Sequence, residues 1–103
     1  MDEIELKEHA ESIATYLVAE HFSVKNKLKD FPRNDLLHII DTAPEDIKEH
    51  LLEDVDRFEE LVISYFFRRL EYMKHEGFLW KRNDTYSIIS DQELDEILEN
   101  LSK

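Results

Sequence analysis

The sequence predicts a mainly helical α+β domain, with four to five helices and one small β-hairpin. The chain of 103 residues has one glycine and two prolines, too few turn-forming residues for a multi-stranded sandwich or barrel. Apolar residues recur at helical spacing along most of the chain, and two short β-prone runs lie together near its C-terminal end. Because a chain of this length builds one hydrophobic core, residues 1–103 are expected to form a single domain.

The first helix is expected over residues 3–21, where apolar residues follow helical spacing and acidic residues lie opposite them. Residues 24–29 alternate loosely, which is typical of either an extended connector or a short strand. Asn34 is the expected N-cap of a brief second helix over residues 35–40.

A stronger helix start follows at Thr42-Ala43-Pro44-Glu45. Thr42 and Glu45 have the spacing of a capping box, and proline is tolerated in the first turn of a helix. Helical spacing then continues to Gly77, either as one helix over residues 45–76 or as two helices that break near residues 54–56. We favour the break, because one helix of this length could not keep its apolar face covered in so small a domain.

A tight hairpin is expected after Gly77, a residue type that commonly ends helices. Residues 78–82 and 85–89 are β-prone, and Asn83-Asp84 between them suits a two-residue loop. This register places Leu79 opposite Ile88 and Phe78 opposite Ile89, with Lys81 and Arg82 near the tip. A second capping box, Ser90-Asp91-Gln92-Glu93, then predicts an acidic amphipathic C-terminal helix over residues 91–101.

The order of these elements resembles the second half of a winged-helix domain. The pattern consists of a helix that ends in Gly77, an apolar strand, a short basic loop and the strand residues Tyr86-Ser87-Ile88. The segment from Phe58 to Ser90 is most similar to the winged-helix domain found N-terminal to Mrr-type restriction nucleases. The resemblance implies a winged-helix-like fold with a two-stranded wing, in which the helix before the hairpin is the recognition helix.

That helix carries the candidate binding residues. At 100° per residue, positions 61–76 separate into an expected core face, with Ile63, Phe66, Phe67, Leu70 and Met73, and a second face. The second face has Leu61, Tyr65, Arg68 and Tyr72, with Arg69 at its margin. It is interpreted either as tyrosines partly covered by neighbouring helices or as a contact surface, since tyrosine and arginine are enriched at interface hot spots. The six candidate residues for binding a partner or DNA are Tyr65, Arg68, Arg69, Tyr72, Lys81 and Arg82.

Charge is unevenly distributed around these residues. The whole chain has a net charge of −12, but residues 65–82 have a net charge of +3 and the remainder −15. Residues 25–33 form a second basic stretch of +3, with Lys25, Lys27, Lys29 and Arg33 against Asp30. The acidic total disfavours binding to DNA or to anionic membranes, although these local basic segments keep a DNA contact open.

The sequence predicts no enzyme, cofactor or metal site. It has no cysteine, no glycine-rich phosphate loop and no serine in a nucleophile elbow. His50 and Asp54 share a helical face, but no third metal ligand accompanies them. The acidic start of the chain and the lack of a long apolar run predict a cytoplasmic protein without a membrane segment.

The preferred hypothesis is therefore a non-catalytic regulatory or adaptor module that binds another protein. The partner is either a different protein or a second copy, with a homodimer formed through the helix over residues 91–101. The alternative is a DNA-binding transcriptional regulator that uses Arg68, Arg69, Lys81 and Arg82. A third hypothesis is an acidic inhibitor that mimics DNA, although its carboxylates are spread over every predicted helix.

Overall fold

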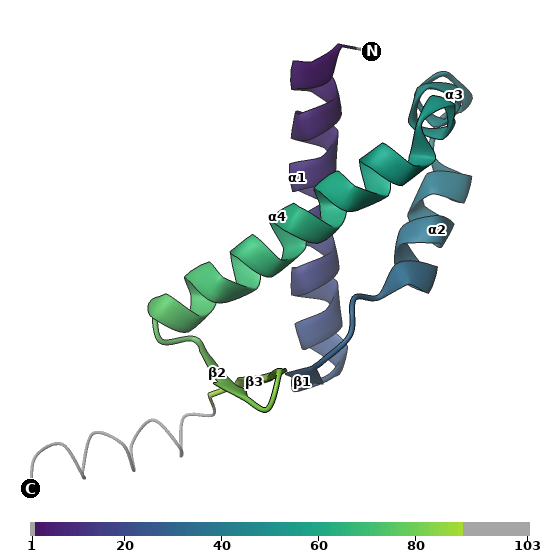
Figure 1. The fold of residues 1–103 in the computed structure, drawn as a ribbon. Helices are drawn as coiled ribbons and strands as arrows, with labels where there is room; N and C mark the ends of the chain where they lie inside the picture. Colours follow the sequence, from purple (N-terminus) through teal and green to yellow (C-terminus); the bar gives the residue numbers. More distant parts are fainter. Residues whose placement is uncertain (1, 90–103) are drawn as a thin grey trace, which may run out of the picture.

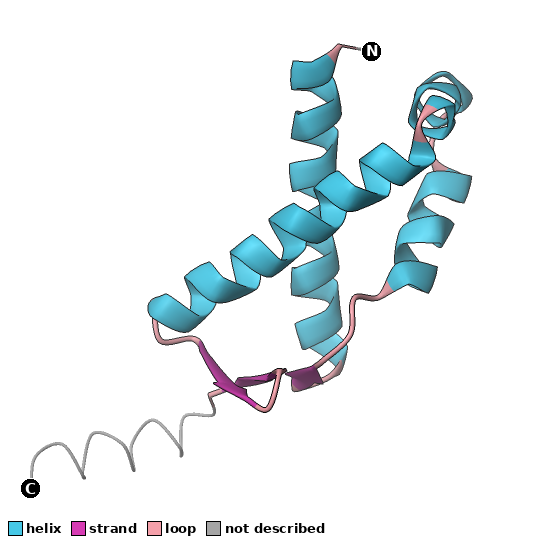
Figure 2. Ribbon diagram, in the orientation of Figure 1, coloured by secondary structure: helices cyan, strands magenta, loops and turns pink. Residues whose placement is uncertain are grey.

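A computed structural model describes residues 2–89 and confirms the mainly helical α+β class (Figures 1 and 2). These residues form four helices and one three-stranded antiparallel sheet. The helix predicted over residues 91–101 lies outside the described residues. The helices are α1 (Glu3–Val24), α2 (Arg33–Thr42), α3 (Glu45–Glu53) and α4 (Val55–His75).

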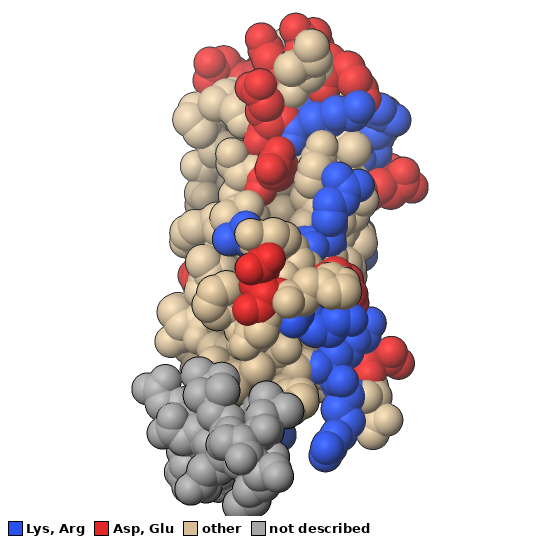
Figure 3. Space-filling view, turned by 90° about the vertical axis from the view of Figure 1, so that its left-hand side faces the viewer, with Lys and Arg blue, Asp and Glu red and all other residues tan. Residues whose placement is uncertain are grey.

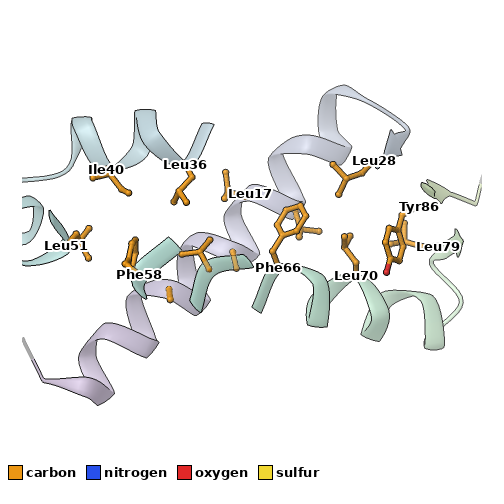
Figure 4. Packing of buried hydrophobic residues seen from close by; sticks show 14 residues of the cluster. Leu17, Leu28, Leu36, Ile40, Leu51, Phe58, Phe66, Leu70, Leu79 and Tyr86 are labelled. Carbon is orange, nitrogen blue, oxygen red and sulfur yellow. The ribbon is translucent and has the colours of Figure 1, made fainter. Parts of the chain in front are cut away.

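Helices α1 and α4 cross each other and form the main packing interface (Figure 1). Asp2 is the N-cap of helix α1, and its carboxylate accepts a hydrogen bond from the backbone N–H of Glu5 at 2.8 Å. Its buried residues include Ala10 and Ala14, whose small side chains let α4 approach closely. The hydrophobic core is elongated, running from α2 and α3, past this crossing, to the sheet (Figure 4). It contains Ala10, Ala14, Leu17, Val18, Leu28, Leu36, Ile40, Leu51, Phe58, Val62, Phe66, Leu70, Leu79 and Tyr86.

Helix α2 begins earlier than its predicted start, and Asn34 lies inside it rather than at the N-cap. Pro32 takes the cap position without a side-chain hydrogen bond. Proline fixes its own backbone close to the conformation in which a helix starts, so the chain turns into α2 before Asn34 is reached.

The capping box predicted at Thr42 and Glu45 does not form. The Thr42 hydroxyl donates instead to the carbonyl oxygen of His38 at 2.9 Å, within the last turn of α2. Thr42 is still part of α2 and its hydroxyl is directed back to the preceding turn, so its side chain does not reach the first N–H groups of α3. Helix α3 still begins at Glu45, directly after Pro44.

The predicted break between two helices is confirmed at Asp54. Helix α3 ends at Glu53 and α4 begins at Val55. The Asp54 carboxylate accepts a hydrogen bond from the backbone N–H of Arg57 at 3.3 Å, so this residue caps α4.

The predicted hairpin and its register are confirmed. It consists of β2 (Leu79–Arg82) and β3 (Thr85–Ile88), with Leu79 opposite Ile88. Asn83 and Asp84 have φ values of 51° and 65°, the left-handed conformation that a type I′ turn requires at both central positions.

The prediction of two strands was incomplete, because β1 (Lys27–Leu28) pairs with β3 as a third strand. The strand order is therefore β1-β3-β2, with β3 in the middle. This pairing resolves the alternatives left open for residues 24–29 in favour of a short strand. It also brings the basic stretch after α1 next to the hairpin.

Candidate functional site

Helix α4 turns a narrower stripe towards the core than the sequence predicts. Val62, Phe66 and Leu70 are fully buried and lie four residues apart. Of the other residues expected in the core, Phe67 and Met73 are only partly buried against it, and Ile63 is partly exposed. The buried stripe follows the i, i+4 row that faces α1 and then the sheet, so residues on either side of this row reach the surface.

Four of the six predicted site residues line one open groove between α4 and α1. Its volume is about 230 Å³. The lining residues are Tyr65, Arg68, Arg69 and Tyr72 from α4, with Glu11 and Thr15 from α1. Sequence reasoning missed Glu11 and Thr15 because they come from a helix about fifty residues earlier in the chain, and only the crossing of α1 with α4 brings them here. Their four-residue spacing, which places both on one side of α1, is the only local signal they carry.

Both arginines of the groove lie over tyrosine rings. The Cζ atom of Arg68 is 5.2 Å from the ring centroid of Tyr65, and that of Arg69 is 5.6 Å from the ring centroid of Tyr72. At these distances a cation–π interaction holds each guanidinium in place, while its N–H groups remain able to donate hydrogen bonds. The groove therefore presents two oriented arginine forks.

The two tyrosines differ in how far they are covered. Tyr65 is half-buried and packs against the core, as the structural interpretation of this face expects. Tyr72 is 53% exposed, so packing within residues 2–89 does not explain its position. An exposed aromatic ring beside an arginine is the combination found at interface hot spots.

Lys81, a predicted site residue, lies outside the groove and is bound to α4. Its Nζ is 3.1 Å from Glu71 Oε1 and 5.1 Å from the ring centroid of Tyr86. Glu71 also accepts from Lys74 Nζ at 2.7 Å and from the Tyr86 hydroxyl at 2.5 Å. Because Glu71 directly precedes Tyr72 in the helix, these contacts lie about 100° around α4 from the Tyr72 side chain.

Glu71 is the electrostatic link between α4 and the hairpin. Hydrogen bonds from Lys74, Tyr86 and Lys81 lower the pKa of Glu71 to about 2. The same contact with Glu71 raises the pKa of Lys81. The pKa of Tyr86 is raised by burial first and then by its hydrogen bond to Glu71. The network keeps Glu71 charged and holds Lys81 against the protein.

Arg82, the sixth predicted residue, is exposed at the hairpin tip and does not line the groove. It lies two residues after Trp80 in β2, so the two side chains point to the same face of the sheet. The six predicted residues are therefore divided among the groove, the Glu71 network and the outer side of the hairpin.

The ion pairs leave the two predicted basic segments largely unneutralised. Within residues 2–89, the lysine and arginine side chains that pair with acidic side chains are Lys7, Arg33, Lys48, Arg57, Lys74 and Lys81. In the same part of the chain, no ion pair forms at Lys25, Lys27, Lys29, Arg68, Arg69 or Arg82. In Figure 3, Lys and Arg side chains form a broken band along one edge of the displayed face, while Asp and Glu side chains gather towards the end at which α1 begins.

The described part of the chain offers no metal centre and no membrane span. Residues 2–89 contain no cluster of three or more His, Cys, Asp or Glu side chains arranged to hold a metal ion. None of the helices in this range combines the length and the apolar character needed to cross a bilayer.

Comparison with known proteins gives no relative for this chain. No protein-family model, curated protein or solved structure matches it significantly.

Proposed function

We propose that this chain is a non-catalytic, winged-helix-like regulatory or adaptor module that binds another protein. The contact is made through the groove of Tyr65, Arg68, Arg69 and Tyr72, with the hairpin beside it. The observation that carries the proposal is the pairing of two arginines with two tyrosines at 5.2 and 5.6 Å, without an ion pair to any carboxylate of residues 2–89. The winged-helix part of the proposal is supported by the place of α4 directly before the hairpin, which the resemblance gives to the recognition helix.

The chemistry of the groove favours a partner that presents a carboxylate next to an apolar or aromatic side chain. Oriented guanidinium forks match a carboxylate with two parallel hydrogen bonds. The exposed ring of Tyr72 offers a flat apolar surface beside them. Glu11, at the opposite wall, can accept a hydrogen bond from a peptide N–H beside that carboxylate, whereas a phosphate backbone has no donor to offer it.

The test is capture of a partner from cell extract on the immobilised native chain, followed by affinity measurements with variants. Arginine hot spots contribute about 2 kcal/mol or more, so Arg68→Ala together with Arg69→Ala should weaken binding at least about 30-fold. Lys25→Ala together with Lys29→Ala is the matched control, because it removes the same charge from residues outside the groove. Equal losses for the two double variants would show that net charge, not the groove, governs binding.

A DNA-binding regulator is the second candidate, supported by the two arginines and Arg82, for which residues 2–89 provide no ion-pair partner. Its weakness is Lys81, whose charge is compensated by Glu71, together with the acidic remainder of the chain. Fluorescence anisotropy with labelled duplex DNA at about 100 mM salt separates the candidates. Binding that Arg68→Ala and Arg69→Ala abolish would favour the regulator over the adaptor.

A further inference from the structure

The outward face of the sheet is apolar and basic, and packing within residues 2–89 leaves it uncovered. Cross-strand pairing places Lys27, Ser87 and Trp80 in one row, so their side chains share a face. The opposite face carries Leu28, Leu79 and Tyr86, which are buried in the core. Strand alternation therefore turns the row of Lys27 and Trp80 away from α4.

Two large aromatic side chains stand on or beside this face. Trp80 is 47% exposed and Phe78 is 61% exposed. Phe78 lies two residues before Trp80, and its carbonyl oxygen accepts a hydrogen bond from the N–H of Ile89 at 3.3 Å, which extends the hairpin pairing. Two basic side chains flank Trp80 on this face. Lys27 lies across the sheet from it, and Arg82 lies two residues further along β2. We define the outward sheet face as Phe78, Trp80, Arg82 and Lys27.

We propose that the outward sheet face is the docking site for residues 91–101 of the same chain. This segment carries Leu94, Ile97, Leu98 and Leu101 at helical spacing, which matches the apolar surface of the two aromatic rings. It also has five acidic residues and no lysine or arginine, the opposite charge to Lys27 and Arg82. The inference does not rest on the groove, because none of the residues of the outward sheet face lines it.

Position and length both favour the chain's own segment over a separate molecule. The segment starts two residues after Ile89, which is hydrogen-bonded to Phe78 at the edge of the face. Eleven residues as a helix extend about 16 Å. The four residues of β2 extend about 13 Å, a close match. A connection of one or two residues gives the segment a much higher effective concentration at this face than a free partner has.

Trp80 is the only tryptophan of the chain, so its fluorescence reports directly on this face. In the native chain we expect a sheltered indole. Leu94→Gln together with Leu98→Gln should shift the emission to the red and increase quenching by acrylamide, a neutral quencher that is insensitive to the charges of the segment. Gln92→Ser together with Asn100→Ser, on the polar side of the segment, is the matched control and should change neither value. Identical emission and quenching in the native chain and the leucine variant would overturn the proposal.

A second measurement separates docking within one chain from docking onto a second copy. The chain has no cysteine, so Asp95→Cys provides a single site for a bimane label, which tryptophan quenches only at short range. We expect quenching that disappears in the Trp80→Phe background and does not change when unlabelled native chain is added in excess. If the labelled Trp80→Phe chain becomes quenched only after native chain is added, the segment docks between copies and the proposal is wrong. Absence of quenching in both experiments overturns it as well. Far-ultraviolet circular dichroism checks that every variant retains the native helix content.

Discussion

Replacing Phe66 by alanine should be among the most destabilising changes in α4. Phe66 is 0% exposed and lies in the part of the core where α4 crosses α1. Its ring makes edge-to-face contacts with Phe31 at 5.0 Å and with Phe67 at 5.4 Å. Truncation of a buried phenylalanine to alanine costs about 3–5 kcal/mol, and the two aromatic pairs place Phe66 towards the upper end of that range. This loss is a large fraction of the stability of a small domain, which is about 5–15 kcal/mol.

Phe67→Ala is the internal control for this prediction. Phe67 is the next residue and makes the same ring contact with Phe66, but it is only partly buried. We expect its truncation to cost about 1–2 kcal/mol, because less apolar surface returns to water. Urea unfolding followed by circular dichroism measures both values. If the two variants lose equal stability, or if Phe66→Ala loses less than Phe67→Ala, the orientation of α4 derived above is wrong.

Two further predictions concern the hairpin and its link to α4. Hydrogen bonds from Lys74, Tyr86 and Lys81 lower the pKa of Glu71 from 4.5 to about 2 in the folded state. The contribution of the Glu71 carboxylate to stability is therefore complete above pH 4.5 and is lost as the pH falls towards 2. Glu71→Gln should therefore flatten the dependence of stability on pH in this window, and an unchanged slope would show that the network does not form in solution. Asp84 has a φ of 65°, so Asp84→Val should destabilise the fold by about 1–2 kcal/mol whereas Asp84→Gly should not. Thermal unfolding of the two variants measures the difference, and equal melting temperatures would contradict the type I′ turn.

Local signals in the sequence were sufficient to predict the hairpin, whereas the break between α3 and α4 was predicted from the size of the domain. Asn83-Asp84 fixes the turn type, and the turn type fixes which residues face each other across the strands. The break near Asp54 was predicted on a different ground, since one helix over residues 45–76 would be too long to keep its apolar face covered. The structure adds the local cause, because Asp54 caps α4 through its own side chain. At the hairpin the conformation is set within a few residues, so no tertiary contact is needed to predict it.

The groove depends on information that no local pattern contains. The sequence places Tyr65, Arg68 and Tyr72 on one side of a helix, but Glu11 and Thr15 reach them only through the crossing of two helices. The crossing also buries Val62, which was not among the expected core residues, while Ile63, Phe67 and Met73 are only partly buried. Strand β1 was ambiguous for a related reason, because two residues form a strand only when β3 is there to pair with them.

Lys81 shows why composition alone misjudges a binding surface. It counts towards the net charge of +3 of residues 65–82, yet Glu71 compensates it directly. Arg68 and Arg69 have the same formal charge but lie over tyrosine rings. The sequence identifies basic side chains, whereas only the packing of the hairpin on α4 determines which of them remain available to a partner.

The most direct test of protein binding at the groove is amide chemical-shift mapping of the native chain, titrated separately with the captured partner and with duplex DNA. With the partner, we expect the largest shifts at Glu11, Thr15, Tyr65 and residues 68–72. Duplex DNA at about 100 mM salt should leave those resonances in place. Shifts in the groove caused by DNA, and abolished by Arg68→Ala with Arg69→Ala, would contradict the proposed adaptor function and establish a nucleic-acid site.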